Sequence, residues 1–217
     1  MRKINRIFYF SVEGQTERQY LQWLQKTINA DSSAQCKVKL EAKVEKNPVS
    51  YVKQLTSLER TTVTHVFDYE SNDAEHQLQF RNTLDQMRKA SQLGKSVKYK
   101  LGYSNYTFEL WIILHKSNCN TPLSHRRQYL QAINRAYHTT FESLDEYKRE
   151  ENFGRILGML SLDDVRQAIR RSEAIEAENQ EHGYTLQQYK GFEFYKENPS
   201  LSIWRAIKNI LSLCGLL

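Results

Sequence analysis

Hydrophobic and polar positions in the first half of the chain follow two periods in turn, that of strands and that of helices. Residues 7–12 are rich in β-formers and predict a buried strand. Thr16 is placed as an N-cap with Gln19 at the capping-box position, so we expect a helix to follow. Its apolar side chains recur at helical spacing: Tyr20, Trp23, Leu24 and Ile28.

Three more strands are predicted before residue 120. One of them alternates apolar side chains with lysines, which is typical of a half-exposed strand near a sheet edge. The three strands occupy residues 37–44, 61–67 and 97–101. Helical periods fill the intervals, over residues 49–58 and through Phe80, Leu84 and Met87. Strands that alternate with helices predict an α/β fold with a mainly parallel sheet flanked by helices.

After the last of these strands the pattern becomes helical. The apolar run in "NYTFELWIILH" predicts a buried helix from about Tyr106. Further helices are predicted over residues 124–137 and 162–178, and after "ENPSLS". We therefore expect an α/β core over residues 1–120, which carries an acidic site, and a mainly helical extension over residues 121–217 that completes the same globular unit.

Composition narrows the class of protein. Of 217 residues, 40% are hydrophobic and 26% charged, which suits a folded chain and not a disordered one. The formal net charge of +6 favours a polyanionic partner. Three widely spaced cysteines favour a reducing cytosol over a zinc site. A basic start followed by a short apolar run resembles a signal peptide, but Glu13 ends the run, so we expect a cytoplasmic protein without a membrane span.

Acidic side chains stand where two predicted strands end. Glu13 and Asp68 would converge if these strands are neighbours, because sites in open α/β sheets form beyond the carboxyl ends of the strands. Glu70 and Asp73 follow closely enough to complete a cluster, and Glu17 lies one helical turn beyond Glu13. Clustered carboxylates suit Mg²⁺ or Mn²⁺. The alternative is that they are solvated acids in polar loops, with Glu17 favouring only the helix dipole.

Two further residues of the long apolar run carry chemistry. Glu109 is costly to bury without a partner, so it either faces the site or forms a structural salt bridge. His115 lies two turns of spacing further along, where it would bind phosphate or act as an acid, although a lone histidine near an apolar helix end is more often structural.

Four segments together resemble the RloB-like family, whose Toprim-type domain is shared with the AbiLii and overcoming-lysogenization-defect nucleases. "VEGQTE" at residues 12–17 is similar to the family signature, and "VFDYES" at residues 66–71 resembles its strand-end acid motif. "FELWIILH" at residues 108–115 is similar to its FELW-type helix, and "ENPSLSIW" at residues 197–204 resembles its closing segment. The four occur in the family's order and span nearly the whole chain.

The resemblance implies a Toprim-like core, cleavage of phosphodiesters with a divalent metal and a role in anti-phage defence, often beside a partner ATPase. On this chain Glu13 matches the first catalytic acid, as metal ligand or general base, and Asp68 matches the first acid of the Asp-x-Asp motif. The second acid is here Glu70, one methylene longer, and Asp73 is a substitute ligand. Asn105 matches the polar residue before FELW, but a tyrosine follows it where the family usually has proline.

Basic side chains offer two candidate surfaces for nucleic acid. Lys95, Lys98 and Lys100 are interleaved with tyrosines, and Arg126 and Arg127 stand at the start of a predicted helix. Such residues hold backbone phosphates, and tyrosines stack on unpaired bases. The alternative is a solvated charged face with packed tyrosines.

Two functions from different classes follow. The first is a nuclease with Mg²⁺ or Mn²⁺, cutting DNA or an RNA such as tRNA in anti-phage defence, with Glu13, Asp68, Glu70 and Glu109 as its catalytic acids. The second is a non-catalytic effector or adaptor of the same fold that binds nucleic acid or an ATPase. An enzyme gated by that ATPase, and a homo-oligomer, remain open alternatives.

Overall fold

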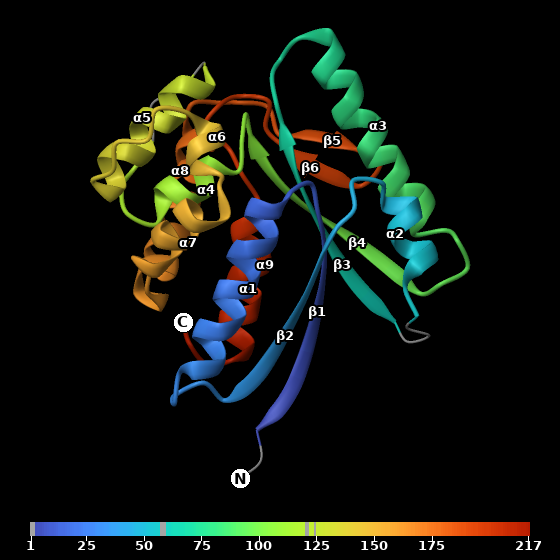
Figure 1. The fold of residues 1–217 in the computed structure, drawn as a ribbon. Coiled ribbons are helices and arrows are strands. Elements are labelled where there is room, and N and C mark those ends of the chain that lie inside the picture. Colours follow the sequence, from blue (N-terminus) through green and yellow to red (C-terminus); the bar gives the residue numbers. More distant parts are fainter. Residues whose placement is uncertain (1–2, 57–59, 120–121, 124) are drawn as a thin grey trace.

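A computed structural model of the chain has a four-stranded sheet at its centre (Figure 1). It describes all residues except 1–2, 57–59, 120–121 and 124, and the side chain of residue 126 is also not described. The four strands are parallel and lie in the order β2-β1-β3-β4. Their bounds are β1 Ile4–Val12, β2 Cys36–Val44, β3 Thr61–Tyr69 and β4 Val97–Asn105. The expected α/β class is confirmed, as is the position of the lysine-bearing strand at an edge.

One face of the sheet is covered by helices from opposite ends of the chain. α1 (Gln15–Ala30) and α9 (Ile203–Leu213) pack on it, and both belong to one hydrophobic cluster with Phe10 and Val12 of β1. Ile207 of α9 is fully buried in this cluster. A buried isoleucine of this kind stabilises the fold by about 2 kcal/mol, so α9 closes the core.

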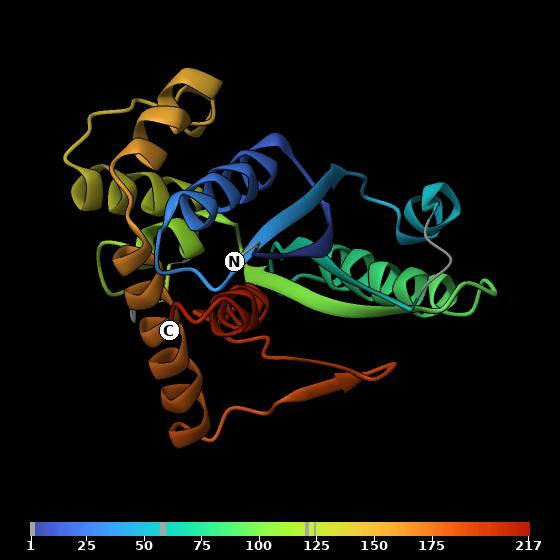
Figure 2. The ribbon, with the colours of Figure 1, turned by 90° about the horizontal axis from the view of Figure 1, so that it is seen from below.

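The other face is covered by α2 (Pro48–Gln54), α3 (Ala74–Ala90) and a hairpin of β5 (Gln187–Tyr189) and β6 (Phe192–Phe194). Phe80 of α3 and Phe194 of β6 pack edge-to-face against each other and against Tyr103 of β4, with ring centroids 4.8–6.3 Å apart. Seen from below, the hairpin runs alongside β4 (Figure 2).

The remaining helices gather beside the carboxyl ends of the strands (Figure 1). They are α4 Glu109–Leu114, α5 Arg126–Tyr137, α6 Leu144–Tyr147, α7 Glu150–Gly158 and α8 Leu162–Glu181. Side chains of these helices and of β1 share one hydrophobic cluster. The division of the chain at residue 120 stays a prediction. In the described part of the chain, no helix combines the length and the apolar character that crossing a membrane requires.

Three local predictions were wrong. The N-cap of α1 is Gly14 and not Thr16, so the helix begins at Gln15 and the capping box with Gln19 does not form. The helix expected from Tyr106 begins at Glu109, because Tyr106 has a left-handed φ of 62° that a right-handed helix cannot contain. The hairpin was missed because its strands of three residues are too short to show a period.

Candidate metal and catalytic site

The carboxyl ends of two neighbouring strands bring Glu13 and Asp68 together. β1 pairs directly with β3, which confirms that the two strands are neighbours, and Val12 lies opposite Val66. Glu13 follows β1, and Asp68 is the penultimate residue of β3. The backbone N–H of Asp68 donates a hydrogen bond to Glu13 Oε2 over 3.1 Å. This bond ties the end of one strand to the acid that follows the other.

Glu17 reaches the same place from the first turn of α1. Its side chain is buried, and a Cβ at position 14 would lie 3.1 Å from Glu17 Oε2. Gly14 therefore leaves the room that this carboxylate uses. Oε2 has no hydrogen-bond partner among the described residues. A buried carboxylate oxygen without a partner costs free energy, so it is typical of a site that expects a ligand or a proton.

Glu109 enters from the start of α4 and is fully buried. The hydroxyl of Thr107 donates a hydrogen bond to Glu109 Oε2, and Lys148 Nζ lies 3.1 Å from Oε1. The side chain of Lys148, at the end of α6, is 41% exposed. Glu109 therefore fits both interpretations. It forms a salt bridge, and it also lies close enough to Glu17 and Asp68 to act on their ionisation.

Burial and mutual repulsion shift the ionisation of these acids. Burial raises the pKa of Glu17 to about 7, with Glu109 and Glu13 adding to the rise and Lys148 opposing it. Burial also raises the pKa of Asp68 well above the usual range, and repulsion by Glu17, Glu13 and Glu109 adds to it. We call these four carboxylates, Glu13, Glu17, Asp68 and Glu109, the acidic cluster.

Lys148 is a basic residue that acts on three members of this cluster, Glu109, Asp68 and Glu17. Burial alone would lower the pKa of the Lys148 ammonium, but the charge and hydrogen bond of Glu109, together with the charges of Asp68 and Glu17, outweigh that effect, so its pKa is raised. A divalent cation would add further positive charge beside these buried carboxylates.

The donor chemistry of the cluster fits a hard divalent cation, because all its donors are carboxylate oxygens. As the side chains lie, however, no group of three or more His, Cys, Asp or Glu side chains in the described part is arranged to hold a metal ion. Binding of Mg²⁺ or Mn²⁺ would therefore draw the carboxylates closer together. Glu17 Oε2, which has no hydrogen-bond partner among the described residues, is one oxygen that is available to such an ion.

Glu70 and Asp73, which the sequence assigned to the metal, lie in a different setting. Asp73 is the N-cap of α3, where its side chain accepts a hydrogen bond from the backbone N–H of His76. His76 also lies 2.6 Å from Asp73 Oδ2 and 3.3 Å from Glu70 Oε2. We call Glu70, Asp73 and His76 the acidic loop. Neither of its carboxylates is among the charges that shift Asp68 or Glu17.

Asn105 and His115 occupy structural positions. Asn105 is buried at the end of β4, where Nδ2 donates to the backbone carbonyl of Glu197 over 2.6 Å while Oδ1 has no partner among the described residues. His115 is buried among aromatic side chains, with Nε2 3.2 Å from the Tyr20 hydroxyl. Burial lowers the pKa of His115 to about 4, which agrees with the structural alternative.

The basic residues predicted to bind nucleic acid differ in whether their charge faces solvent. Lys98 and Lys100 are exposed on the edge strand, and Arg127 is exposed in the first turn of α5. Lys95 instead turns its ammonium onto the backbone carbonyls of Val52 and Leu55 after α2. The side chain of Arg126 lies outside the described residues.

Sequence patterns did not identify Lys148 as part of the site, and the close approach at Gly14 was not predicted from them. Lys148 is one of several charged residues in "DEYKREEN", and nothing in that run distinguishes it. The glycine between Glu13 and the helix was the one available signal, because a glycine next to a strand end often marks a close approach.

Comparison with known proteins gives one match. A family model described as "RloB-like protein" matches residues 8–210. No curated protein matches the chain, and neither does a solved structure.

Proposed function

This chain belongs to the RloB-like family, and we propose that it is a metal-dependent nuclease that cleaves nucleic-acid phosphodiesters at the acidic cluster. One observation carries the proposal. Four carboxylates at or after the ends of three different strands converge at the carboxyl edge of a parallel sheet, and burial and mutual repulsion raise the pKa values of two of them, Glu17 and Asp68, although Lys148 lies beside them. That arrangement destabilises the protein unless a cation or a proton relieves it.

Glu13, Glu17, Asp68 and Glu109 would hold the metal. A divalent ion at this place supplies Lewis-acid activation of the phosphodiester. The backbone N–H of Asp68 fixes the orientation of the Glu13 carboxylate. Lys148 and the Thr107 hydroxyl do the same for Glu109.

Glu17 is suited to a second task. A carboxylate with a pKa near neutrality is able to take up and release a proton during turnover. Its unpartnered Oε2 is the atom that would receive this proton. The proposal thus gives Glu13 and Glu109 a role in holding the metal, and gives Glu17 proton transfer in addition.

The wider role that we propose is anti-phage defence in the cytoplasm, beside a partner ATPase. A protein that cuts nucleic acid within its own host needs restraint, and control of a nuclease by a nucleotide-dependent partner would supply it. The exposed basic residues Lys98, Lys100 and Arg127 support nucleic acid as the partner.

The test is cleavage by the purified protein. Mixed tRNA, single-stranded DNA and duplex DNA are incubated with Mg²⁺ or Mn²⁺, beside a chelator control and a Glu13→Gln variant. We expect cleavage of one class of substrate that disappears in both controls. Calorimetric titration with Mg²⁺ alone measures binding of the metal independently, and Glu13→Gln should weaken it.

Absence of cleavage would have two separate meanings. If Mg²⁺ binds but nothing is cut until the partner ATPase is added, the enzyme is gated. If neither Mg²⁺ binding nor cleavage occurs with the ATPase present, the chain is an adaptor and the proposal is wrong.

A further inference from the structure

A groove of about 510 Å³ lies far from the acidic cluster, between the start of β4, the C-terminal end of α3 and the β5–β6 hairpin. Five cationic side chains line it, and no aspartate or glutamate does so among the described residues. We call this hollow the basic groove. Its cationic side chains are Arg60, Arg88, Lys95, Lys98 and Lys190.

Most of this charge is available to a ligand. Arg60, Arg88 and Lys98 are exposed and form no ion pair with any residue that the structure describes. Lys190 is 4.0 Å from Asp85, which is a long and weak pair. Collecting like charges without counter-ions raises the free energy of the folded protein, so an anionic partner is the simplest reason for the arrangement.

The hairpin turn presents one of these cations in a strained conformation. Lys190 and Gly191 form the two-residue turn with φ values of 53° and 86°. A turn of this kind favours asparagine or glycine at its first position. A lysine there costs stability, and its ammonium gains a place at the rim of the basic groove.

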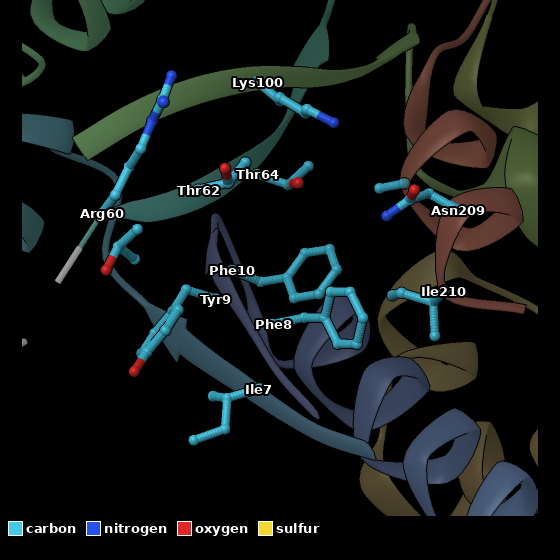
Figure 3. A pocket seen from close by; sticks show the side chains of 12 residues that line it. Ile7, Phe8, Tyr9, Phe10, Arg60, Thr62, Thr64, Lys100, Asn209 and Ile210 are labelled. Carbon is cyan, nitrogen blue, oxygen red and sulfur yellow. The ribbon is translucent and has the colours of Figure 1, made fainter. Parts of the chain in front are cut away.

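The positive surface continues around the start of the sheet. Arg60 also lines a second pocket of about 470 Å³ between the sheet and α9, shown in Figure 3. There Lys100 points from β4 toward α9, near the hydroxyls of Thr62 and Thr64 and opposite Asn209. No acidic side chain of the described chain lines this pocket either.

We propose that the basic groove binds the phosphate backbone of double-stranded nucleic acid. A groove lined by cations and free of carboxylates matches a regular polyanion. The aromatic side chains beside it, Tyr99 and Phe192, are buried or partly buried in the core, so the groove offers no exposed platform on which unpaired bases would stack. Contacts to the backbone of a duplex remain.

The distance between the basic groove and the acidic cluster sets the length of duplex that would reach both sites. Arg60 precedes β3 and Asp68 stands eight residues later along that strand, so the two sites are about 26 Å apart at 3.3 Å per residue. A duplex rises about 3.4 Å per base pair, so roughly eight base pairs would connect groove and cluster. This length argument rests on the proposed nuclease function, whereas duplex binding does not.

The experiment measures binding in the presence of chelator, so that it is independent of cleavage. Fluorescence anisotropy follows a labelled 16-base-pair duplex, as DNA and as RNA, and one strand of each alone, between 0.05 and 0.3 M salt. The test variant is Arg88→Ala with Lys98→Ala. The matched control is Lys26→Ala with Arg170→Ala, which removes the same charge from exposed positions on α1 and α8.

Each lost phosphate contact weakens binding about fivefold at 0.15 M salt, so the test variant should bind about 25-fold more weakly than the wild type, with a salt slope reduced by about two. The control variant should bind within about twofold of the wild type, since non-specific charge effects at distant sites are small. Thermal unfolding confirms that both variants are folded. Equal weakening in the two variants, or tighter binding of a single strand than of either duplex, would overturn the proposal.

A cleavage experiment tests the length of about eight base pairs between the basic groove and the acidic cluster. If the protein cuts nucleic acid, the test variant should raise KM for a 16-base-pair substrate while kcat stays unchanged, and should leave KM unchanged for a hairpin with a stem of four base pairs. Equal KM effects on both substrates would contradict a groove that acts only on the long one. If no substrate is cut, the anisotropy result alone decides whether the groove binds duplex.

Discussion

The acidic cluster and the acidic loop contain the same type of side chain within a few residues of each other in sequence, yet their surroundings differ. In the acidic loop, hydrogen bonds from Ser71 and from the backbone and ring of His76 hold the pKa of Asp73 well below its usual range. In the acidic cluster, burial and repulsion raise the pKa values of Glu17 and Asp68. The surroundings of the acidic loop thus favour the ionised form of Asp73, whereas those of the acidic cluster disfavour the ionised forms of Glu17 and Asp68.

The difference shows how a functional carboxylate is distinguished from a structural one. Asp73 caps α3, and its hydrogen bond to His76 is the main cause of the raised pKa of that histidine. Such acids stabilise the fold and need no further ligand. Carboxylates that are buried together retain unfavourable energy that only a cation or a proton removes. Four experiments would break or sharpen this distinction.

Activity should separate the two regions most clearly. We expect Asp68→Asn to lower cleavage roughly a thousandfold, a loss typical of removing one catalytic electrostatic partner. Glu70→Gln, a matched change in the acidic loop, should lower it less than about tenfold, because Glu70 pairs with His76 at 3.3 Å. Initial rates on the best substrate measure both, and equal losses would return Glu70 to the metal site.

Stability against pH should carry the signature of Glu17. Its folded pKa of about 7 lies above the ordinary 4.5, so the folded state holds an extra proton between these values. The contribution of Glu17 to the stability of the metal-free protein is therefore largest below pH 4.5 and is lost as pH rises through 7, by about 3 kcal/mol. Denaturant unfolding at pH 5 and pH 8 measures the fall.

Glu17→Gln is the control for that measurement, because it removes the titration while keeping the shape. The variant should lose the part of the pH dependence that comes from Glu17, while the part from Asp68 remains, and it should be more stable than the wild type at pH 8. A wild-type protein whose stability rises from pH 5 to pH 8 would show that the cluster is not strained.

Lys148 and Lys116 offer a comparison between an ion pair of the cluster and one outside it. Lys148→Met should destabilise the metal-free protein by about 1–2 kcal/mol, since it leaves Glu109 buried while the lysine itself is partly exposed. Lys116→Met, which breaks a 2.8 Å pair with Asp164, should cost a similar amount. Thermal unfolding with and without Mg²⁺ distinguishes the two variants. The loss of stability relative to the wild type should become smaller in Mg²⁺ for the Lys148 variant and stay the same for the Lys116 variant.

The smallest effect belongs to the helix cap. Asp73→Ala should lower stability by about 1 kcal/mol with activity retained, since it removes the N-cap of α3. Asp73→Ser keeps a capping oxygen and should stay close to the wild type. Loss of cleavage in both variants, with stability unchanged, would mean that Asp73 acts in catalysis.

Local patterns predicted the frame of the site. The strand and helix periods placed β1, β3 and β4 within a few residues of their bounds, and the parallel direction of β1 and β3 follows from the helices α1 and α2, which return the chain before β2 and before β3. Glu13 and Asp68 could be assigned to one edge because parallel strands end at the same edge. Glu70 seemed equally good from its spacing, because spacing carries no information on burial.

What the sequence determined by itself is therefore the class of fold, the family and the four acids as candidates, since these depend on periodicity and on short motifs. Tertiary structure alone decided the rest. Glu17 became a buried acid because Gly14 leaves room for it, and Glu109 gained a partner from Lys148, 39 residues further along the chain. The basic groove likewise joins residues of β4, α3 and a hairpin about 90 residues after that strand. Electrostatic energy depends on distance and burial in space, and neither can be read from spacing along the chain.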